Sequence, residues 1–253
     1  MIIDVIIPAY NEQDAIAKVI QALPKNILRE IVVVNNNSSD ATTENARLAG
    51  ATVLTEIRQG YGFACLKGIA YLTGKAIAPD IVLFIDADYS DYPEEAVEVL
   101  QPIIDGRADM VIGSRALGNK QKGSMTIPQV FGTWLATNLL HLIYKTSFTD
   151  LGPFRAIKFQ QLLALNMQDT TYGWTVEMQL KAAKQKLVCV EVPVKYRKRV
   201  GVSKISGTVK GTILAGYKIL YTIFTISIII HSTVPYYFNN TNRFFNKAVT
   251  DLK

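Results

Sequence analysis

The stretch Ile81-Val82-Leu83-Phe84-Ile85-Asp86-Ala87-Asp88 decides the fold: five apolar residues are followed by two carboxylates with one alanine between them. An unbroken apolar run of this length, with Pro79-Asp80 before it, predicts a strand that is buried on both faces. Residues two apart on an extended backbone point to the same side. Asp86 and Asp88 are therefore expected to face one point beyond the strand's carboxyl end.

This end of the strand is a candidate metal site, because ligands of open α/β sheets bind at the carboxyl ends of the strands. Two carboxylates there suit Mg²⁺ or Mn²⁺, which proteins often hold with one or two acidic residues and substrate phosphates. The alternative is a strand followed by a plain polar turn, since residues 88–93 also have the composition of a turn and helix start. The pair of acids by itself leaves both interpretations open.

Strands and helices alternate around this stretch from Met1 to Gly113. The expected strands are Ile2–Ile7, Ile31–Val34, Thr52–Leu54, Ile81–Ile85 and Met110–Ile112. The expected helices are Asn11–Leu23, Asp40–Leu48, Gly62–Leu72 and Pro93–Ile104, with Asn11 as a cap and Gly50 as a stop. Repeated strand–helix units of about 25–30 residues predict an α/β fold with a doubly wound, mainly parallel sheet and helices on both faces.

The alternation ends after Gly113. The remaining expected elements are the helices Gln129–Tyr144 and Thr175–Gln185 and the strands Phe154–Phe159 and Leu187–Val194. Six basic residues follow in Lys195–Lys210, and then an uncharged run from Ile219 to Asn242 predicts a C-terminal apolar helix. We therefore expect one catalytic domain over residues 1–210 and a membrane-proximal extension over residues 211–253.

Composition narrows the class of protein. Of the 253 residues 49% are hydrophobic, which predicts a globular protein, and the net charge of +6 favours anionic partners. Two cysteines provide no disulfide framework, which is typical of a reducing compartment. No signal peptide is expected, because the first residues enter a strand directly. Only two histidines exist, so catalysis by several histidines is excluded.

Polar segments follow the first two strands and precede the third helix. Pro8-Ala9-Tyr10-Asn11-Glu12 and the loop Asn35–Asp40 are placed to contact a base or ribose, although helix capping by Asn11 and Asp40 is an equal explanation. Gly60-Tyr61-Gly62 is expected to let a ligand approach closely, although two glycines are equally ordinary in a turn. Neither a G-x-G-x-x-G sequence nor a Walker A sequence occurs, which disfavours dinucleotide and P-loop chemistry.

Taken in order, these motifs resemble the inverting glycosyltransferases of family 2, which bind nucleotide sugars with a GT-A fold. Within that family the chain resembles the polyprenyl- or dolichyl-phosphate hexosyltransferase branch. The motifs that carry the resemblance are Pro8-Ala9-Tyr10-Asn11-Glu12, Val33-Val34-Asn35-Asn36-Asn37-Ser38-Ser39-Asp40, Asp86-Ala87-Asp88, Gly113-Ser114-Arg115 and Thr149-Asp150-Leu151-Gly152-Pro153-Phe154-Arg155. They extend over most of residues 2–210.

The resemblance implies that Asp86 and Asp88 hold the metal and the donor diphosphate. The nucleotide-sugar-binding residues expected here are Pro8, Ala9, Tyr10, Glu12, Asn35, Asn37, Asp40, Gly60, Asp86, Ala87 and Asp88. Two positions depart from the family. Asn35 stands where many relatives have aspartate, which leaves the choice between a UDP- and a GDP-hexose open. Ser90 stands where glutamine is frequent, which weakens the case for a third ligand on the metal side.

The chemistry of transfer suggests further roles. A carboxylate facing the oxocarbenium-like anomeric carbon stabilises it, and Asp150 is the candidate, as charge stabiliser or base, alongside Asp88. A lipid phosphate acceptor is largely ionised near neutral pH, so it needs positive charge more than a strong base. The acceptor-binding candidates are Arg115, Arg155, Arg199, Ser203 and Lys204, each with a solvated surface charge or polar group as the alternative. Arg197 and Lys198 are expected to be surface charges, and Glu177 either contacts a sugar or supports the fold.

The leading hypothesis is a hexosyltransferase that uses a polyprenyl phosphate at the cytoplasmic face of a membrane. The run Ile219–Asn242 and the basic segment Lys195–Lys210 would then hold it at the membrane surface. A soluble acceptor is the second hypothesis. A nucleic-acid-binding protein is the third, and it is disfavoured because the basic segment has only Tyr196 as an interleaved aromatic residue. The sequence leaves the oligomeric state open.

Overall fold

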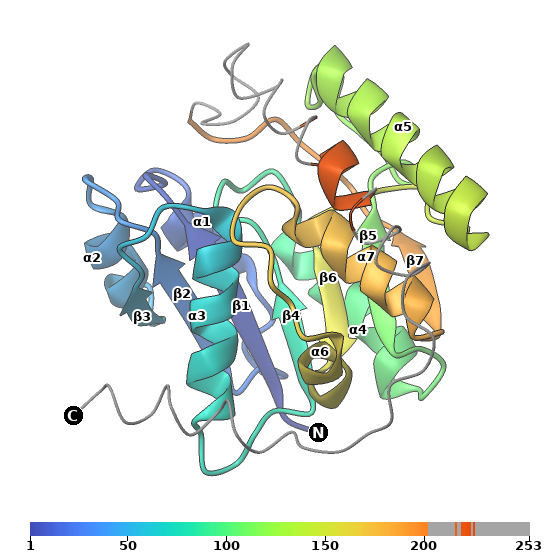
Figure 1. The fold of residues 1–253 in the computed structure, drawn as a ribbon. Helices are drawn as coiled ribbons and strands as arrows, with labels where there is room; N and C mark the ends of the chain where they lie inside the picture. The colour runs from blue at the N-terminus through green and yellow to red at the C-terminus, as the bar shows by residue number, and fades with distance from the viewer. Residues whose placement is uncertain (202–215, 217–218, 224, 226–253) are drawn as a thin grey trace.

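The computed structural model describes residues 1–201, 216, 219–223 and 225. Seven strands of this part form one sheet with the order β3-β2-β1-β4-β6-β5-β7 (Figure 1). The strands are β1 (Ile3–Ala9), β2 (Glu30–Asn35), β3 (Thr52–Thr55), β4 (Ile81–Phe84), β5 (Met110–Ser114), β6 (Arg155–Lys158) and β7 (Cys189–Pro193). All neighbouring pairs are parallel except the two that β6 makes with β4 and β5. The mainly parallel sheet predicted from the sequence is confirmed.

Helices cover both faces of the sheet. They are α1 (Ile16–Ala22), α2 (Thr42–Leu48), α3 (Tyr61–Thr73), the 3₁₀ turn η1 (Pro93–Glu95), α4 (Ala96–Ile104), α5 (Ile127–Tyr144), α6 (Phe159–Leu165) and α7 (Trp174–Lys184). Apolar residues of α1, α2 and α4 belong to one buried cluster with the sheet, and those of α3, α6 and α7 belong to a second. The fold is therefore a three-layer αβα arrangement, as in GT-A enzymes.

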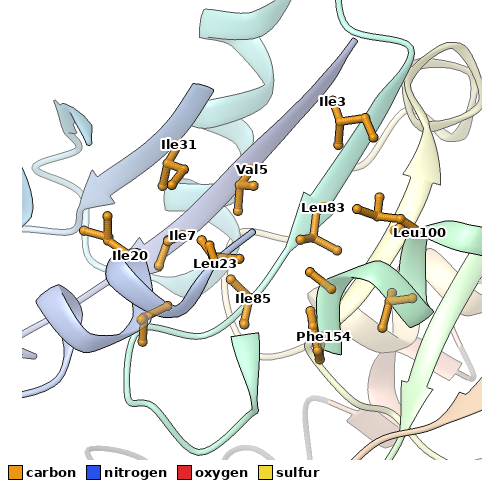
Figure 2. Packing of buried hydrophobic residues seen from close by; sticks show 14 of the residues in the cluster. Ile3, Val5, Ile7, Ile20, Leu23, Ile31, Leu83, Ile85, Leu100 and Phe154 are labelled. Atoms are coloured by element: carbon orange, nitrogen blue, oxygen red, sulfur yellow. The ribbon is translucent and has the colours of Figure 1, made fainter. Parts of the chain in front are cut away.

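Strand periodicity explains why the sheet has two buried faces. Ile81 and Leu83 of β4 belong to the cluster under α1 and α4, whereas Val82 and Phe84 belong to the cluster under α3 and α7. Figure 2 shows the first cluster, in which Val5 of β1 lies beside its β4 neighbours. Each such fully buried side chain contributes roughly 1.5–3 kcal/mol relative to an exposed one. The continuous apolar run in β4 follows from burial on both sides.

The antiparallel strand β6 explains why the alternation ends after Gly113. Arg155, its first residue, pairs with Phe84 of β4 and with Ile112 of β5. The amino end of β6 therefore lies at the carboxyl ends of its two neighbours. This placement brings the preceding loop, residues 149–154, to the edge of the sheet where ligands bind in α/β folds.

Three local predictions need comment. Asn11 does not cap a helix: α1 begins at Ile16, and the Asn11 side chain instead accepts a hydrogen bond from the Ser39 backbone N–H at 2.8 Å. The helix α6 was not predicted, because its seven residues are too few to show a clear period. Gly50, with a φ of 94°, follows the end of α2 as expected.

The predicted extension falls mostly outside the described residues, as does the domain boundary at residue 210. Within the described part of the chain, no helix has the length and hydropathy needed to cross a bilayer. Residues 219–223 are helical, and Ile223 is fully buried in a third apolar cluster with residues of α5 and α7. Ile219 and Ile223 of the extension therefore pack against the catalytic domain.

Candidate active site

A cleft of about 470 Å³ lies at the carboxyl ends of β1, β2 and β4. Its lining consists of Pro8, Ala9, Tyr10, Glu12, Asn36, Gln59, Gly60, Tyr61, Ala64, Asp86, Ala87, Asp88, Thr171, Tyr172 and Arg199. Nine of these residues are among the predicted site residues. They are Pro8, Ala9, Tyr10, Glu12, Gly60, Asp86, Ala87, Asp88 and Arg199. The register explains their proximity, because Ala9 pairs with Asn35 and Ile6 pairs with Phe84, so the three strands end side by side.

The two carboxylates after β4 both line the cleft, as predicted. One oxygen of Asp86 accepts a hydrogen bond from the Tyr61 hydroxyl at 3.1 Å. Burial and the charge of Asp88 raise the pKa of Asp86 to about 7. For Asp88, Oδ1 accepts hydrogen bonds from Ser90 N–H at 2.9 Å and Ser90 O–H at 2.5 Å, and Oδ2 lies 3.3 Å from Nη1 of Arg199. Ser90 therefore orients Asp88.

This pair fits a divalent cation that is held jointly with a diphosphate. Among the residues that the structure describes, no cluster of three or more His, Cys, Asp or Glu side chains is arranged to hold a metal. Two carboxylates on one side of the cleft nevertheless match the way Mg²⁺ is bound through one or two acids plus substrate oxygens. Burial and, after it, repulsion by Asp88 raise the pKa of Asp86, and a divalent cation held by the two carboxylates would offset both effects.

A third acid near the pair went unnoticed in the sequence. Asp91 is 2% exposed, and neither of its carboxylate oxygens has a hydrogen-bond partner among the described residues. Burial, together with the charge of Asp86, raises the pKa of Asp91 well above its ordinary value. A buried carboxyl without partners is most stable when protonated, so Asp91 adds little negative charge to the site.

The loop after β2 contributes a different asparagine from those predicted. Asn36 lines the cleft, donates from Nδ2 to the Arg58 carbonyl at 2.7 Å, and accepts at Oδ1 from the Gly60 N–H at 2.7 Å. The predicted Asn35 and Asn37 do not line it. Asn35 accepts instead from the Ser38 N–H, and Asn37 is exposed in a left-handed turn with a φ of 61°. The structure therefore brings neither of these two residues to the cleft, and their contact with the nucleotide stays a prediction.

Asp40 shapes the loops without reaching the cleft. Its Oδ1 accepts from the Thr42 N–H at 3.0 Å, and its Oδ2 accepts from the Gln13 N–H at 3.2 Å. These bonds tie the start of α2 to the segment after β1. The structure therefore shows the structural role that was the alternative for Asp40, and its contact with the ligand stays a prediction.

The loop of residues 168–172 forms a wall of the cleft that the sequence did not reveal. Thr171 and Tyr172 line the cleft, and the loop packs directly against the amino end of α3. A Cβ atom added at Gly62 would lie 2.0 Å from the Asp169 carbonyl oxygen, and one at Gly60 would lie 2.2 Å from that of Thr170. The two glycines before and within α3 are thus required by this loop.

Glu177 holds that loop in place from the first turn of α7. Its carboxylate accepts hydrogen bonds from the backbone N–H groups of Gln168 at 2.9 Å and of Asp169 at 2.7 Å, and it is 3% exposed. It does not line the cleft, so support of the fold, one of its two predicted roles, is the role that the structure shows.

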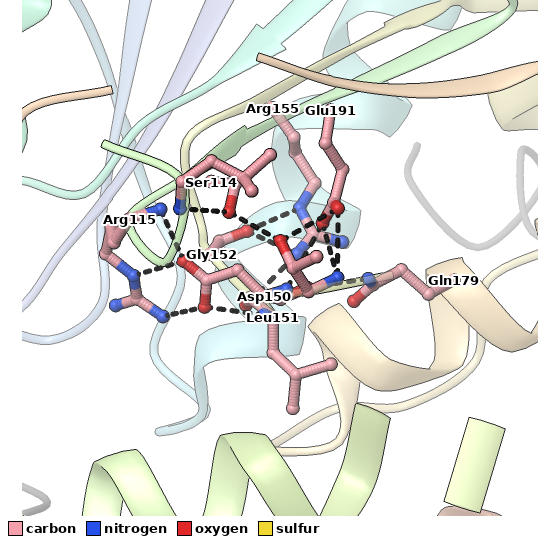
Figure 3. Close-up of polar contacts among 10 residues, drawn as sticks. Ser114, Arg115, Asp150, Leu151, Gly152, Arg155, Gln179 and Glu191 are labelled. Atoms are coloured by element: carbon pink, nitrogen blue, oxygen red, sulfur yellow. Dashed lines mark hydrogen bonds and ion pairs between the residues drawn. The ribbon is translucent and has the colours of Figure 1, made fainter. Parts of the chain in front are cut away.

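Asp150 and Arg115 form a buried ion pair beside the cleft (Figure 3). Oδ2 of Asp150 accepts from the backbone N–H and the Nε–H of Arg115, both at 2.8 Å. Oδ1 accepts from Nη2 of Arg115 and from the Leu151 N–H, both at 2.7 Å. Burial opposes ionisation, but Arg115 holds the pKa of Asp150 below its ordinary value.

Neither member of this pair lines the cleft. Both oxygens of Asp150 accept hydrogen bonds within the protein, so in this structure it is held as a structural ion partner, and its role as a charge stabiliser or base stays a prediction. Arg115 has its fork on Asp150 and its guanidinium 5.0 Å from the centre of the Tyr196 ring, and its role as a phosphate ligand stays a prediction too. The pair joins the turn after β5 to the loop before β6.

The other residues discussed for the acceptor side, apart from Arg199, fall into three groups. Arg155 is fully buried and donates to the carbonyl oxygens of Gly152 at 2.9 Å and Thr175 at 3.0 Å, so the structure does not bring it to the cleft, and its phosphate role stays a prediction. Arg197 stacks between two tyrosine rings, which makes the surface-charge interpretation wrong, whereas Lys198 is exposed as expected. Ser203 and Lys204 lie outside the described residues.

Arg199 is the predicted phosphate ligand that does reach the cleft. Its Nη2 donates to Oε1 of Glu12, and its Nη1 lies 3.3 Å from Oδ2 of Asp88. The cleft thus combines carboxylates for a cation, one guanidinium for an anion and three tyrosines (Tyr10, Tyr61 and Tyr172) on its walls. This composition suits a charged ligand with a flat ring.

Comparisons with known proteins agree with this reading of the cleft. The sequence pattern described as Glycosyl transferase family 2 matches residues 4–163. An uncharacterised glycosyltransferase of Mycobacterium tuberculosis is 32% identical over 220 residues, which cover 84% of this chain and 94% of that protein. An undecaprenyl-phosphate mannosyltransferase of Micrococcus luteus is 26% identical over 221 residues, which cover 81% of this chain and 88% of that protein.

A solved structure shares the fold. Glucosyl-3-phosphoglycerate synthase from Mycobacterium tuberculosis, crystallised with Mn²⁺, uridine diphosphate and phosphoglyceric acid, aligns with a TM-score of 0.70. Its sequence is 20% identical, and the alignment covers 89% of this chain and 78% of that chain.

Proposed function

The chain belongs to glycosyltransferase family 2, and from this premise we propose that it transfers a hexose from a nucleotide-diphosphate sugar to a polyprenyl phosphate at a membrane surface, with inversion at the anomeric carbon. The observation that supports the donor half is the cleft at the carboxyl ends of β1, β2 and β4, with Asp86 and Asp88 on its wall. The observation that supports a phosphate acceptor is the engagement of Asp150 by Arg115.

Asp86 and Asp88 would hold Mg²⁺ or Mn²⁺ together with the donor diphosphate. When bound there, the cation supplies a Lewis acid that neutralises the charge growing on the leaving diphosphate. Ser90 and Tyr61 orient the two carboxylates through the hydrogen bonds described above. The Tyr10 ring, 37% exposed on the wall of the cleft, offers a face on which a nucleobase can stack.

The acceptor argument is chemical. A hydroxyl acceptor loses its proton as it attacks, so its enzyme needs a positioned base. The sequence candidate for that base, Asp150, has both oxygens bonded to Arg115 and to backbone N–H groups. A phosphate acceptor is already ionised near neutral pH and attacks without a base. The undecaprenyl-phosphate mannosyltransferase among the relatives is named for such an acceptor.

Helix α5 supports a membrane location. Its 18 residues include none with a formal charge, and Ile127, Phe131, Trp134 and Leu142 are 58–85% exposed. The helix lies along the outside of the molecule, beside residues 219–223 (Figure 1). Exposed lysines precede it at 120 and 122 and follow it at 145. An uncharged helix with exposed aromatic residues and basic flanks is typical of proteins that lie in a membrane interface.

Two assays test the proposal. Transfer from labelled UDP- and GDP-hexoses is measured to polyprenyl phosphate in detergent and, separately, to small hydroxyl acceptors, and we expect product only with the lipid. Binding to anionic liposomes is measured by co-sedimentation for the wild type and for Phe131→Glu with Trp134→Glu, which we expect to abolish it. Leu48→Glu with Ile77→Glu is the matched control, since Leu48 is 80% exposed and Ile77 65%, and the pair introduces the same two charges away from α5.

The C-terminal extension is tested by truncation. A cut after Lys218 would remove Ile223, which is fully buried, and would destabilise the catalytic domain. A cut after Thr225 retains that contact. We expect the chain that ends at Thr225 to keep nucleotide binding and to lose part of its affinity for liposomes. If the full-length protein does not bind anionic liposomes at low salt, the support for a membrane acceptor is lost.

A soluble acceptor is the second candidate. Its support is the fold shared with glucosyl-3-phosphoglycerate synthase, whose solved complex contains phosphoglyceric acid. Transfer to a small phosphorylated hydroxyl compound, with no transfer to lipid phosphate, would establish this candidate in place of the first.

A further inference from the structure

Arg199 occupies a position that the reaction described so far does not explain. Its guanidinium lies between two acids of the cleft, with Nη1 3.3 Å from Oδ2 of Asp88 and Nη2 bonded to Oε1 of Glu12. Oδ1 of Asp88 is already engaged by the N–H and O–H groups of Ser90. Arg199 therefore contacts the oxygen of Asp88 that is left for a cation.

The backbone that carries Arg199 is fixed to the segment after β4. The Arg197 N–H donates to the Ser90 carbonyl at 2.9 Å, and the Val200 N–H donates to the Asp88 carbonyl at 2.9 Å. The side chain itself is 25% exposed and long enough to turn about this fixed base. Its Nε–H is buried and has no hydrogen-bond partner among the described residues. A buried donor of this kind is incomplete without a ligand.

We propose that Arg199 is an exchangeable counter-ion that couples cation binding to donor binding. In the empty cleft it neutralises Asp88 and so competes with a divalent cation for that carboxylate. When cation and donor enter together, Arg199 leaves Asp88 and binds the donor diphosphate with the freed Nη1, while Glu12 retains its Nη2. The inference rests on the proposed function and adds to it an order of events: Mn²⁺ alone binds weakly, and nucleotide raises its affinity.

The proposal predicts the direction in which the cation affinity changes when the charge of Arg199 is removed, and this direction can be tested. Removing a positive charge that competes for Asp88 strengthens cation binding in the empty cleft, whereas the loss of a merely structural residue weakens it or leaves it unchanged. Removing the same charge from the donor-bound state weakens nucleotide binding, because a guanidinium–phosphate pair is lost. By reciprocity, the coupling between the two ligands falls by the same factor for each.

The experiment measures Mn²⁺ dissociation constants by electron paramagnetic resonance, without nucleotide and with saturating UDP or GDP. We expect Arg199→Gln to bind Mn²⁺ alone at least about fivefold more tightly than the wild type, and to show a reduced effect of nucleotide. Lys198→Gln is the matched control: it removes the same charge from an exposed neighbour and is expected to change both constants less than twofold. Arg199→Lys keeps the charge without the fork, so its affinity for Mn²⁺ alone should stay near the wild-type value while nucleotide binds less tightly.

Circular dichroism melts of each variant establish that it is folded before binding is measured. Unchanged or weaker binding of Mn²⁺ alone to Arg199→Gln, or an equal gain in Lys198→Gln, would overturn the proposal while leaving the glycosyltransferase assignment intact. A wild-type protein that binds neither Mn²⁺ nor nucleotide would instead contradict the proposed function itself.

Discussion

Replacing Asp150 by asparagine separates a structural role from a catalytic one. Each carboxylate oxygen of Asp150 accepts two N–H groups: Oδ2 from the backbone N–H and Nε of Arg115, and Oδ1 from Nη2 of Arg115 and the Leu151 N–H. In Asp150→Asn the amide nitrogen replaces one of these oxygens. In either orientation, the amide NH₂ group takes the place of an oxygen that accepted two N–H groups. Those two donors then face another donor and have no acceptor.

The expected cost follows from this geometry. Each of the two unsatisfied buried donors costs about 1–3 kcal/mol. The Arg115 side chain, 10% exposed, also loses its counter-ion. Breaking a buried pair in this way typically costs about 3–5 kcal/mol. This amount is a large share of the roughly 5–15 kcal/mol by which a domain is stable. We therefore expect Asp150→Asn to reduce the free energy of unfolding by about 3–5 kcal/mol.

Urea unfolding, followed through the fluorescence of the buried Trp174 and through circular dichroism, measures the change. Asp105→Asn is the control, because it breaks the exposed Asp105–Arg107 pair, which has a similar distance of 2.8 Å, and should cost at most about 1 kcal/mol. Equal stability of the two variants would refute the structural role. If Asp150→Asn also kept its stability and lost more than about a thousandfold in single-turnover rate, the role of base predicted from the sequence would be right.

Three further predictions concern the cleft. Gly62→Ala places a Cβ 2.0 Å from the Asp169 carbonyl oxygen and should displace the loop of residues 168–172, so both the melting temperature and the nucleotide affinity should fall. Gly74→Ala is the control, because its Cβ meets nothing closer than 3.6 Å and should change neither quantity by much. Because burial and a neighbouring carboxylate raise the pKa of Asp86 to about 7 in the folded state, the stability contributed by its proton is lost as pH rises through 7. Asp86→Asn should thus raise the melting temperature clearly at pH 8 and little at pH 4.5; an equal shift at both values would contradict the assignment. Tyr61→Phe removes the hydroxyl that donates to Asp86 and should move the pH at which this stability is lost upward, as a pH series of melts would show.

Local sequence patterns were sufficient to predict the sheet and the wall of the cleft that the segments after β1 and β4 form. The apolar run before Asp86 and the short polar segments after β1 and β2 are each read from neighbouring residues. The rule that ligands bind at the carboxyl ends of parallel strands then brings them together. Seven cleft residues followed from this reasoning, including Asp86, Asp88 and Glu12.

The other wall depends on contacts between distant segments, which no local pattern encodes. Gly60 and Gly62 carried a signal of close approach, but their partner is backbone more than 100 residues later in the chain. Asn35 and Asn37 were predicted as nucleotide contacts because they lie in the polar loop that follows the second strand. The strand ends at Asn35, however, and the positive φ of Asn37 turns the chain, so that Asn36 faces the cleft.

Buried charges are the second place where the structure differs from what the sequence suggested. Asp150, Arg115 and Arg155 were interpreted by residue type as groups for catalysis or phosphate binding, yet all three are buried and bonded within the protein. One signal was available: Arg155 opens an apolar segment, Arg155-Ala156-Ile157, which forms a central strand. A charge at such a position is desolvated and has to bond to fixed groups nearby.

The central claim is that Asp86 and Asp88 form a cation-dependent nucleotide-sugar site, and a thermal-shift panel of UDP- and GDP-sugars with and without Mn²⁺ tests it most directly. At about 100 times its dissociation constant, a ligand of the folded state contributes about 2.7 kcal/mol, or about 5–10 °C for a domain of this size. We predict such a shift for one nucleotide class, only with Mn²⁺, in the wild type but not in Asp88→Asn. A shift that persists without Mn²⁺ or in Asp88→Asn, or the absence of any shift in the wild type, would contradict the account.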